Sequence, residues 1–186
     1  SYLAWYYLDN PEGTAAVGRG YDGNRLTGNY ALIPQRFQAA TKSDVRLGLG
    51  VDLAVHPEFR GTGTYRRTVE ASYRVGAADG LSGILGVANA QSVPRMTDTF
   101  GWRRLPDFRA RFLTPIADGV RCSNHLVGPA LLAGPLLDEA LPQPTEPPPT
   151  GHGARWSTDL LRWRLARPGA NYVLHLRDDV TFISVE

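Results

Sequence analysis

Apolar and polar residues alternate in several short stretches of this sequence, a pattern typical of strands with one buried face. The clearest stretch contains Val51, Leu53 and Val55, and it predicts a central strand over Leu47–Val55. By this parity, Asp52 should face away from those three side chains. The other predicted strands are Thr14–Gly18, Arg25–Gln35, Ile84–Val87 and Leu105–Thr114.

A helical period replaces the alternation soon after the central strand. Tyr65, Val69 and Tyr73 recur every four residues, which places them on one face of a helix predicted over Thr64–Ala78. The aromatic opening of the chain, Ser1–Asp9, predicts a short helix whose rings are buried in the core. The chain thus passes from an apolar strand through a turn into an amphipathic helix.

The two strands before the central one form a predicted hairpin. They are separated by Asp22-Gly23, which favours a tight turn because both residues tolerate positive φ. Pro34 has no backbone N–H to donate, so it is expected at the end or at an edge of the second strand.

A basic turn that contains two glycines lies between the central strand and its helix. Gly61 and Gly63 lack a Cβ, so the backbone there can turn sharply and approach a ligand closely. Unpaired amides at a helix start and the helix dipole both favour an anion, and Arg60 adds positive charge. The residues match neither a P-loop nor a dinucleotide fingerprint. The turn predicts a pyrophosphate site, and an ordinary strand-to-helix turn stays open as the alternative.

The residues around this turn resemble the acetyl-CoA-binding motif of the GNAT acyltransferase superfamily. Its Val-x-Pro and Arg-x-x-Gly-x-Gly/Ala elements occur here as Val55-His56-Pro57 and Arg60-Gly61-Thr62-Gly63-Thr64-Tyr65, with Tyr65 in place of the usual small residue. Asn89 and Gly101-Trp102 also follow in the GNAT order, and Trp5–Gly13 resembles the opening of a bacterial branch. The resemblance implies an α/β (α+β) fold. Its mixed, mostly antiparallel central sheet would be flanked by helices and splayed between the two central parallel strands.

The resemblance also implies where acetyl-CoA, the cosubstrate, would bind. The pantetheine arm would lie between the splayed strands and pair with extended backbone of the central strand. The amide of Val55 would stabilise the oxyanion that forms when a small-molecule amine attacks the thioester directly. Asn89 would lie beside the arm or would cap the next helix, and the two roles stay open. The implied CoA-binding residues are Leu53, Ala54, Val55, Arg60, Gly61, Thr62, Gly63, Thr64, Tyr65, Asn89 and Ser92.

Proton transfer is assigned only in part. Asp52 is the candidate base, because a partly desolvated carboxylate can deprotonate an ammonium directly or through a water; pairing with an arginine is the alternative. Many GNAT members place a tyrosine, the acid, where this chain has Thr97, and a threonine is not a competent acid. The general acid therefore has no assigned residue. His56, Arg66 and Arg67 are expected to be solvated.

The sequence divides into three predicted segments. Residues 1–117 form the GNAT domain, 118–155 form a Pro-rich linker region, and 156–186 begin a second, incomplete GNAT-like unit. The second unit is inferred from a repeat, since Leu161-x-Trp163 matches Leu3-x-Trp5 and Asp178-Asp179 matches the Asp22-Gly23 turn. Ser157 is a good N-cap for its helix. A helix and a hairpin cannot bury a core alone, so further residues would be needed, or the unit packs on the first domain or on a partner.

Composition and charge exclude several classes of protein. Of 186 residues, 42% are hydrophobic and 20% are charged, which fits an ordinary globular chain, and a net charge of +2 gives no argument for nucleic acid. No apolar run is long enough for a membrane span, and neither the four histidines nor Cys122 has the spacing of a metal site. One cysteine and the lack of a leader favour the cytoplasm. The sequence leaves open whether the chain forms a homodimer.

The primary hypothesis is an acetyl-CoA-dependent N-acetyltransferase, because the turn, the strand and the later motifs occur in the GNAT order. Its acceptor would be a small amine, for which the bacterial branch suggests an amino sugar. Two other functions stay open. One is a CoA-binding domain with lost or altered chemistry, such as a decarboxylase or a regulatory module, and the other is an interaction domain whose turn binds nothing.

Overall fold

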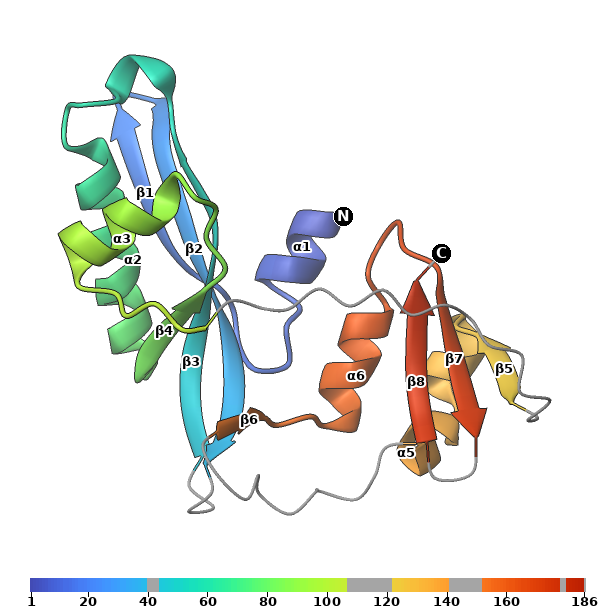
Figure 1. Ribbon diagram of the computed structural model, residues 1–186. Coiled ribbons are helices and arrows are strands. Elements are labelled where there is room, and N and C mark those ends of the chain that lie inside the picture. Colours follow the sequence, from blue (N-terminus) through green and yellow to red (C-terminus); the bar gives the residue numbers. More distant parts are fainter. Residues whose placement is uncertain (40–43, 107–121, 141–151, 178–179, 186) are drawn as a thin grey trace.

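Two β-sheets, each with its own buried core, organise the residues that the computed structural model describes, which are 1–39, 44–106, 122–140, 152–177 and 180–185 (Figure 1). The buried side chains of the first core are Ala16, Tyr30, Leu32, Val69 and Met96. Those of the second core are Leu137, Leu161, Leu165, Tyr172 and Leu174. The chain therefore forms two units, and the first carries the predicted anion-binding turn.

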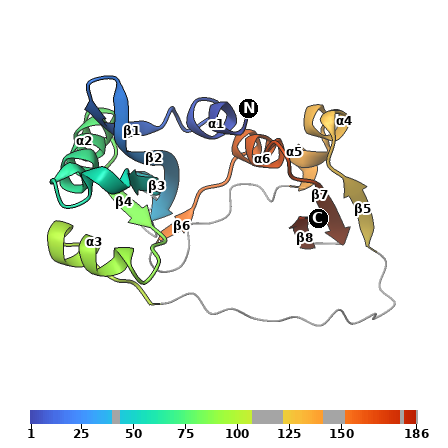
Figure 2. The ribbon, with the colours of Figure 1, turned by 90° about the horizontal axis from the view of Figure 1, so that it is seen from above.

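The first sheet has the strand order β1-β2-β3-β4. Its strands are β1 (Ala16–Asp22), β2 (Arg25–Ala39), β3 (Asp44–Val55) and β4 (Gly83–Gly86), and β6 (His152–Ala154) pairs with the far end of β2. The predicted hairpin is present, but its turn lies at Gly23 and Asn24, one residue later than expected, because Asp22 still pairs with Arg25 at the end of β1. β1, β2 and β3 are antiparallel, whereas β3 and β4 are parallel. This mixed sheet, flanked by helices (Figure 2), confirms the predicted fold class.

The expectation for Pro34 is only half right, because β2 continues past it to Ala39. Pro34 pairs with Gly48 of β3, and its carbonyl accepts a hydrogen bond from the Asn10 side chain at 2.9 Å. The nitrogen and the carbonyl of one strand residue point to the same side. The missing N–H therefore lies on the side where pairing with β1 has already ended, at Leu32, and no ladder bond is lost.

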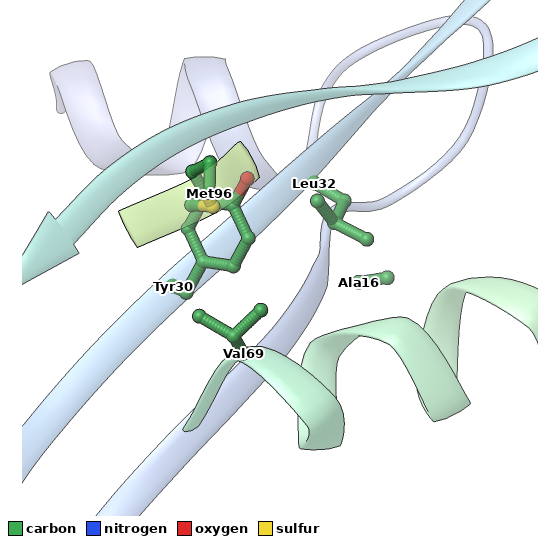
Figure 3. Close-up of a cluster of buried hydrophobic side chains, with 5 residues drawn as sticks. All are labelled: Ala16, Tyr30, Leu32, Val69 and Met96. Atoms are coloured by element: carbon green, nitrogen blue, oxygen red, sulfur yellow. The ribbon is translucent and has the colours of Figure 1, made fainter. Parts of the chain in front are cut away.

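One face of the first sheet is covered by α2 (Thr64–Ala78) and α3 (Ser92–Phe100), as both ribbon views show (Figures 1 and 2). α2 has the predicted bounds and buries the predicted face, since Val69 is fully buried and both tyrosines pack against the same core. Figure 3 shows Val69 below the ring of Tyr30, with Met96 of α3 beside the same ring. The helix that begins at the glycine turn is thus anchored by the core.

The opposite face of the sheet is approached by α1 (Tyr2–Tyr7) (Figures 1 and 2). Ser1 caps this helix by accepting a hydrogen bond from the Ala4 amide at 3.3 Å. The predicted short helix is therefore present. The expectation that its rings are buried holds for Trp5, which is 5% exposed, but is wrong for Tyr2, which is 42% exposed.

The second unit contains more of the chain than expected. Its elements are β5 (Ser123–Leu126), α4 (Pro129–Ala133), α5 (Leu136–Ala140), α6 (Thr158–Leu165), β7 (Tyr172–Arg177) and β8 (Val180–Val185), with the antiparallel strand order β5-β7-β8. The predicted helix and hairpin are α6, β7 and β8, and Ser157 caps α6 through the Leu160 amide at 3.1 Å. The predicted linker over 118–155 is wrong for 122–140, because Leu137 is fully buried in the same core as Leu161.

Some expectations lie outside the described residues. These are the Pro-rich stretch 141–151, the turn Asp178-Asp179, and the part of the predicted strand Leu105–Thr114 that follows Pro106. Leu105 and Pro106 themselves are not in a strand.

A reciprocal contact joins the two units through α1 and α6. The rings of Trp5 and Trp163 stack, with centroids 4.8 Å apart and planes 16° from parallel. The Trp5 indole N–H donates to the Trp163 carbonyl at 2.7 Å, and the Trp163 indole N–H donates to the Trp5 carbonyl at 2.8 Å. The same contact is therefore made in both directions by the two residues that the sequence repeat matches. That 156–186 repeats the opening of the chain stays a prediction.

Trp163→Phe is expected to lower the free energy of unfolding by about 1–2 kcal/mol, because the ring remains while the indole donor and part of the stacked surface are lost. Chemical denaturation measures this. In a double-mutant cycle with Trp5→Phe, the two changes should couple by about 1 kcal/mol. Trp156→Phe is the control, since Trp156 is 54% exposed and its change should stay within about 0.5 kcal/mol. Strictly additive effects of the paired changes would show that the reciprocal contact contributes nothing.

Candidate functional site

The predicted anion-binding turn lies between a short 3-10 helix, η1 (Pro57–Phe59), and α2. Gly61 and Gly63 have φ of 82° and 80°, a region that favours glycine. Gly63 is the N-cap of α2, and no side chain of the described residues caps the helix, so the amides of its first turn remain available. A Cβ at Gly61 would meet nothing within 4 Å, so the backbone is open to a ligand there.

Arg67 is exposed, as expected, and it also contacts the turn. Its Nη1 donates to the Thr62 carbonyl at 3.1 Å, and its Nη2 donates to Thr64 Oγ1 at 3.2 Å. Helical side chains point back toward the helix N-terminus, which explains how a residue in the first turn of α2 reaches this position. Arg60 and Arg66 are both exposed. The guanidinium that the described residues hold at the turn is therefore that of Arg67.

The side chain of Tyr65 packs against the core, and its expected role as a CoA ligand stays a prediction. Its ring centre is 5.8 Å from that of Phe100, and Arg95 lies over it at 5.9 Å. The hydroxyl is buried with no hydrogen-bond partner in the described part of the chain, and burial raises the pKa of this phenol. The aromatic residue at this motif position thus packs between α2 and α3.

β3 and β4 separate as the resemblance implies. Their parallel pairing joins Leu47–Gly50 to Gly83–Gly86, and β3 then continues to Val55 while β4 ends. The last part of β3 therefore has its β4 side free of the neighbouring strand. An extended ligand could pair with this backbone in the manner of an added strand.

The backbone amide of Val55 points toward this gap. Val55 is paired with Gly28 of β2, and the next residue, His56, donates its N–H to the Thr27 carbonyl at 2.8 Å. Successive peptide groups of a strand point to alternate sides, so the Val55 N–H faces away from β2. This is the orientation that the predicted oxyanion role requires.

A bulge interrupts β3 at Asp52. Ala54 pairs with Asn29 and Val51 pairs with Ala31, so two residues of β3, Asp52 and Leu53, lie opposite the single Tyr30 of β2. Asp52 has a φ of 53°. Aspartate tolerates this left-handed conformation better than most residues do. The extra residue breaks the alternation, so Val51 lies on the opposite face from the two later apolar residues of the strand. The prediction that all three share a face is wrong for this reason.

The Asp52 carboxylate lies beside Tyr7 of α1. The Tyr7 hydroxyl donates to Asp52 Oδ2 at 2.6 Å, and the Asn29 side chain donates to the Asp52 carbonyl at 3.2 Å. Burial, then the hydrogen bond to Asp52, raise the pKa of Tyr7, so it stays a protonated donor at neutral pH. No ion pair joins Asp52 to an arginine within the described ranges. Asp52 is exposed, which corrects the expectation of partial desolvation.

Asn89 makes contacts at the start of α3 of the kind that its capping alternative implies, although the N-cap residue of the helix is Gln91. Its Oδ1 accepts hydrogen bonds from the amides of Gln91 and Ser92 at 3.1 and 2.9 Å, where α3 begins. Thr97, at the position of the usual acid, turns its Oγ1 back onto its own helix, 3.1 Å from the Val93 carbonyl. Asn89 and Ser92 thus lie together after β4, and Thr97 is committed to local contacts.

The Tyr30 hydroxyl is a candidate general acid that sequence analysis missed. Tyr30 is 2% exposed, and its hydroxyl lies so close to Gly50 that a Cβ there would overlap it. Gly50 is the last residue of β3 that pairs with β4, so this hydroxyl lies where the strands part. Burial raises the pKa of Tyr30, and its neighbours Tyr73 and Tyr65 raise it further. Its position depends on strand register, for which the sequence carries no local signal.

Other kinds of site are not formed by the described residues. Within them, no group of three or more His, Cys, Asp or Glu side chains could hold a metal ion. His56, expected to be solvated, lies 2.9 Å from a nitrogen of Arg25, which also pairs with Glu58 at 2.7 Å. None of the helices in these ranges has the length and apolar character needed to cross a membrane.

Comparison with known proteins gives matches among solved structures. No protein-family model matches the sequence, and no curated protein matches it. An acetyltransferase of Trypanosoma brucei matches with 18% identity and a TM-score of 0.42, over 53% of this chain and 70% of that one. A glucosamine-6-phosphate N-acetyltransferase of Arabidopsis thaliana matches with 11% identity and a TM-score of 0.40, over 48% and 59%. A predicted acetyltransferase of Clostridium acetobutylicum, solved with acetyl-CoA, matches with 16% identity and a TM-score of 0.43, over 50% and 60%.

The matches thus cover about half of this chain and between 59% and 70% of those structures. The fold of the first unit is established by the order and pairing of its own strands. It shows an antiparallel hairpin, a central strand, and a parallel neighbour that parts from it. The first unit therefore has the mixed α/β fold and the order of elements that the GNAT resemblance predicts.

Proposed function

We propose that this chain is a GNAT-type acyltransferase that moves an acetyl group from acetyl-CoA to a small-molecule amine. The observation that carries the proposal is the parting of β3 and β4 directly before a glycine turn, with the Val55 amide facing the gap. A thioester in this gap would present its carbonyl oxygen to that amide. The same molecule would place its diphosphate at the start of α2.

The turn would hold the diphosphate through backbone amides and arginine. The amides of residues 61–64 lie at the positive end of the α2 dipole. Arg67 is held beside them by Thr62 and Thr64, so little side-chain freedom would be lost when it meets a phosphate. Arg60 is exposed at the entrance to the turn and can add a second positive charge.

The reaction is a direct transfer. The amine nitrogen attacks the thioester carbon, and a C–N bond forms. The negative oxygen of the tetrahedral intermediate accepts a hydrogen bond from the Val55 N–H. The C–S bond then breaks and CoA leaves as a thiolate. Asp52 takes the proton that the ammonium loses, directly or through a water, and Tyr30 is the candidate donor to the thiolate. Tyr30 fills the role for which Thr97 is unsuitable.

A thermal-shift titration with acetyl-CoA and with free CoA tests the CoA site. Ligand at a hundred times its Kd stabilises the folded state by about 2.7 kcal/mol, which should raise the melting temperature by about 5–10 °C in a chain of this size. Gly63→Asp should abolish the shift, because it adds a side chain at the helix start and a negative charge where the diphosphate would bind. Arg67→Gln should reduce the shift.

Gly80→Asp is the matched control, since Gly80 has a φ of 81° and lies at the other end of α2. Both aspartate variants should lose similar stability from the strained backbone. Only Gly63→Asp should lose the response to CoA. If neither ligand shifts the wild-type protein, or if both variants lose the shift equally, the CoA site is refuted.

A CoA-binding domain without transferase activity is the second candidate. It is favoured by the local hydrogen bonds of Thr97, which leave α3 without the usual acid. Such a domain would show the thermal shift but would release no CoA thiol from acetyl-CoA with any amine tested. An amino sugar as acceptor and a location in the cytoplasm are further parts of the primary proposal.

A further inference from the structure

The end of α6 presents two arginines to α1. Trp163 of α6 stacks on Trp5 of α1, Arg164 follows it in the last turn of the helix, and Arg167 comes directly after the C-cap residue Ala166. The guanidinium carbon of Arg167 lies 5.5 Å from the centre of the Tyr2 ring. The second unit therefore brings positive charge to the aromatic edge of the first.

Tyr6 links these arginines to Asp52. The Tyr6 ring centre is 6.1 Å from that of Tyr7, whose hydroxyl donates to the Asp52 carboxylate. Burial raises the pKa of Tyr6 and the charge of Asp52 adds to the rise, whereas the charges of Arg164 and Arg167 oppose it. The ring centres of Tyr2 and Tyr6 are 5.7 Å apart, so a row of tyrosine side chains leads from Arg167 to the Asp52 carboxylate.

The charges of these two arginines are not neutralised by ion pairs within the described residues. Arg162, on the same helix, is different because it pairs with Asp138 at 2.8 Å and with Asp159 at 3.7 Å. Arg164 and Arg167 are also exposed. They are therefore available to an anionic solute on the α1 side of the sheet, where Asp52 lies.

We propose that Arg164 and Arg167 form the anion-binding half of the acceptor site, and that the acceptor is an amine that also carries a carboxylate or phosphate group. This rests on the proposed function. Asp52 would attract the ammonium, and the arginines would hold the anionic group through paired N–H donors, which suit carboxylate and phosphate alike. Tyr2 and Tyr6 would line the space between them. The second unit would thereby select the substrate of the first.

Isothermal titration calorimetry on the whole chain tests this with two pairs of probes. The phosphate pair is glucosamine 6-phosphate against glucosamine, and the carboxylate pair is glycine against glycinamide. The charged member of at least one pair should bind wild type about tenfold more tightly than its neutral partner. Added salt should shrink the preference, because the arginines are exposed. The pair that shows the preference identifies the anionic group.

Two double variants locate the effect. Arg164→Gln/Arg167→Gln should abolish the preference, whereas Arg74→Gln/Arg103→Gln, which removes the same charge from other exposed positions, should keep it. Equal binding of charged and neutral probes, no binding of either charged probe at millimolar concentration, or a preference that survives the first double variant would each overturn the proposal. The CoA thermal shift is measured on the same samples. A shift without the preference refutes the anion site alone, whereas loss of the wild-type shift refutes the proposed function.

Discussion

Asp52→Asn is expected to lower kcat by about 10²- to 10³-fold at neutral pH, because a positioned general base contributes about that much and an amide cannot accept the ammonium proton. The reaction is followed as CoA thiol released from acetyl-CoA with an accepted amine. The loss should shrink as the pH rises toward the pKa of the free amine, since more of the acceptor then arrives deprotonated. The CoA thermal shift should not change.

Asparagine is the appropriate replacement at this position for a backbone reason. Asp52 has a φ of 53°, and asparagine tolerates this left-handed conformation, whereas alanine would add strain and blur the result. Tyr7→Phe is the control, since it removes the hydrogen bond to Asp52 while keeping the carboxylate and most of the ring. That variant should retain most of kcat. A loss of equal size in both variants would indicate that the pair has a structural role and that Asp52 is not the base.

Short-range patterns predicted the parts of the fold that short-range physics determines. The bounds of α2 follow from a glycine N-cap and a four-residue apolar period, and both are visible in the sequence. The turn at Gly61 and Gly63 is equally local. The parting of β3 and β4 was expected only from the family resemblance, because no residue pattern within either strand encodes where a neighbour ends.

The features that sequence analysis missed depend on contacts between distant parts of the chain. The bulge at Asp52 is defined by its register against β2, and the Tyr7 hydroxyl that contacts Asp52 is 45 residues away in the sequence. Leu137 lies in the segment that was assigned to the linker region. It becomes core only when α6 and β7 pack against it.

The same reasoning explains why the acceptor side was the least predictable. The cosubstrate side is built from one continuous segment, from β3 through η1 into α2, so its residues are neighbours in the sequence. The acceptor side combines α1, the bulge of β3 and the end of α6. Asp52 could be chosen as a candidate base from its strand alone, whereas Tyr7 and Arg164 could be found only in the folded chain.

The close packing of α2 on the hairpin gives the largest expected effect on stability. Gly18→Ala should lower the free energy of unfolding by about 3 kcal/mol, because overpacking that cannot relax is costly. A Cβ at Gly18 would overlap the carbonyl oxygen of Thr68 and lie 2.5 Å from the amide nitrogen of Ser72. Both atoms belong to the backbone of α2, so no side-chain rotation can make room. The helix must move away from β1 or the strand must bend.

Gly128→Ala is the control for Gly18→Ala in urea denaturation. Gly128 precedes α4 with a φ of −136°, and a Cβ there would meet nothing within 4 Å, so its replacement should cost less than about 1 kcal/mol. Because α2 carries the glycine turn, Gly18→Ala should also weaken CoA binding, although residue 18 lies outside the turn. A Gly18→Ala protein as stable as wild type would show that α2 can separate from β1 at little cost. The turn would then be positioned by the loop alone.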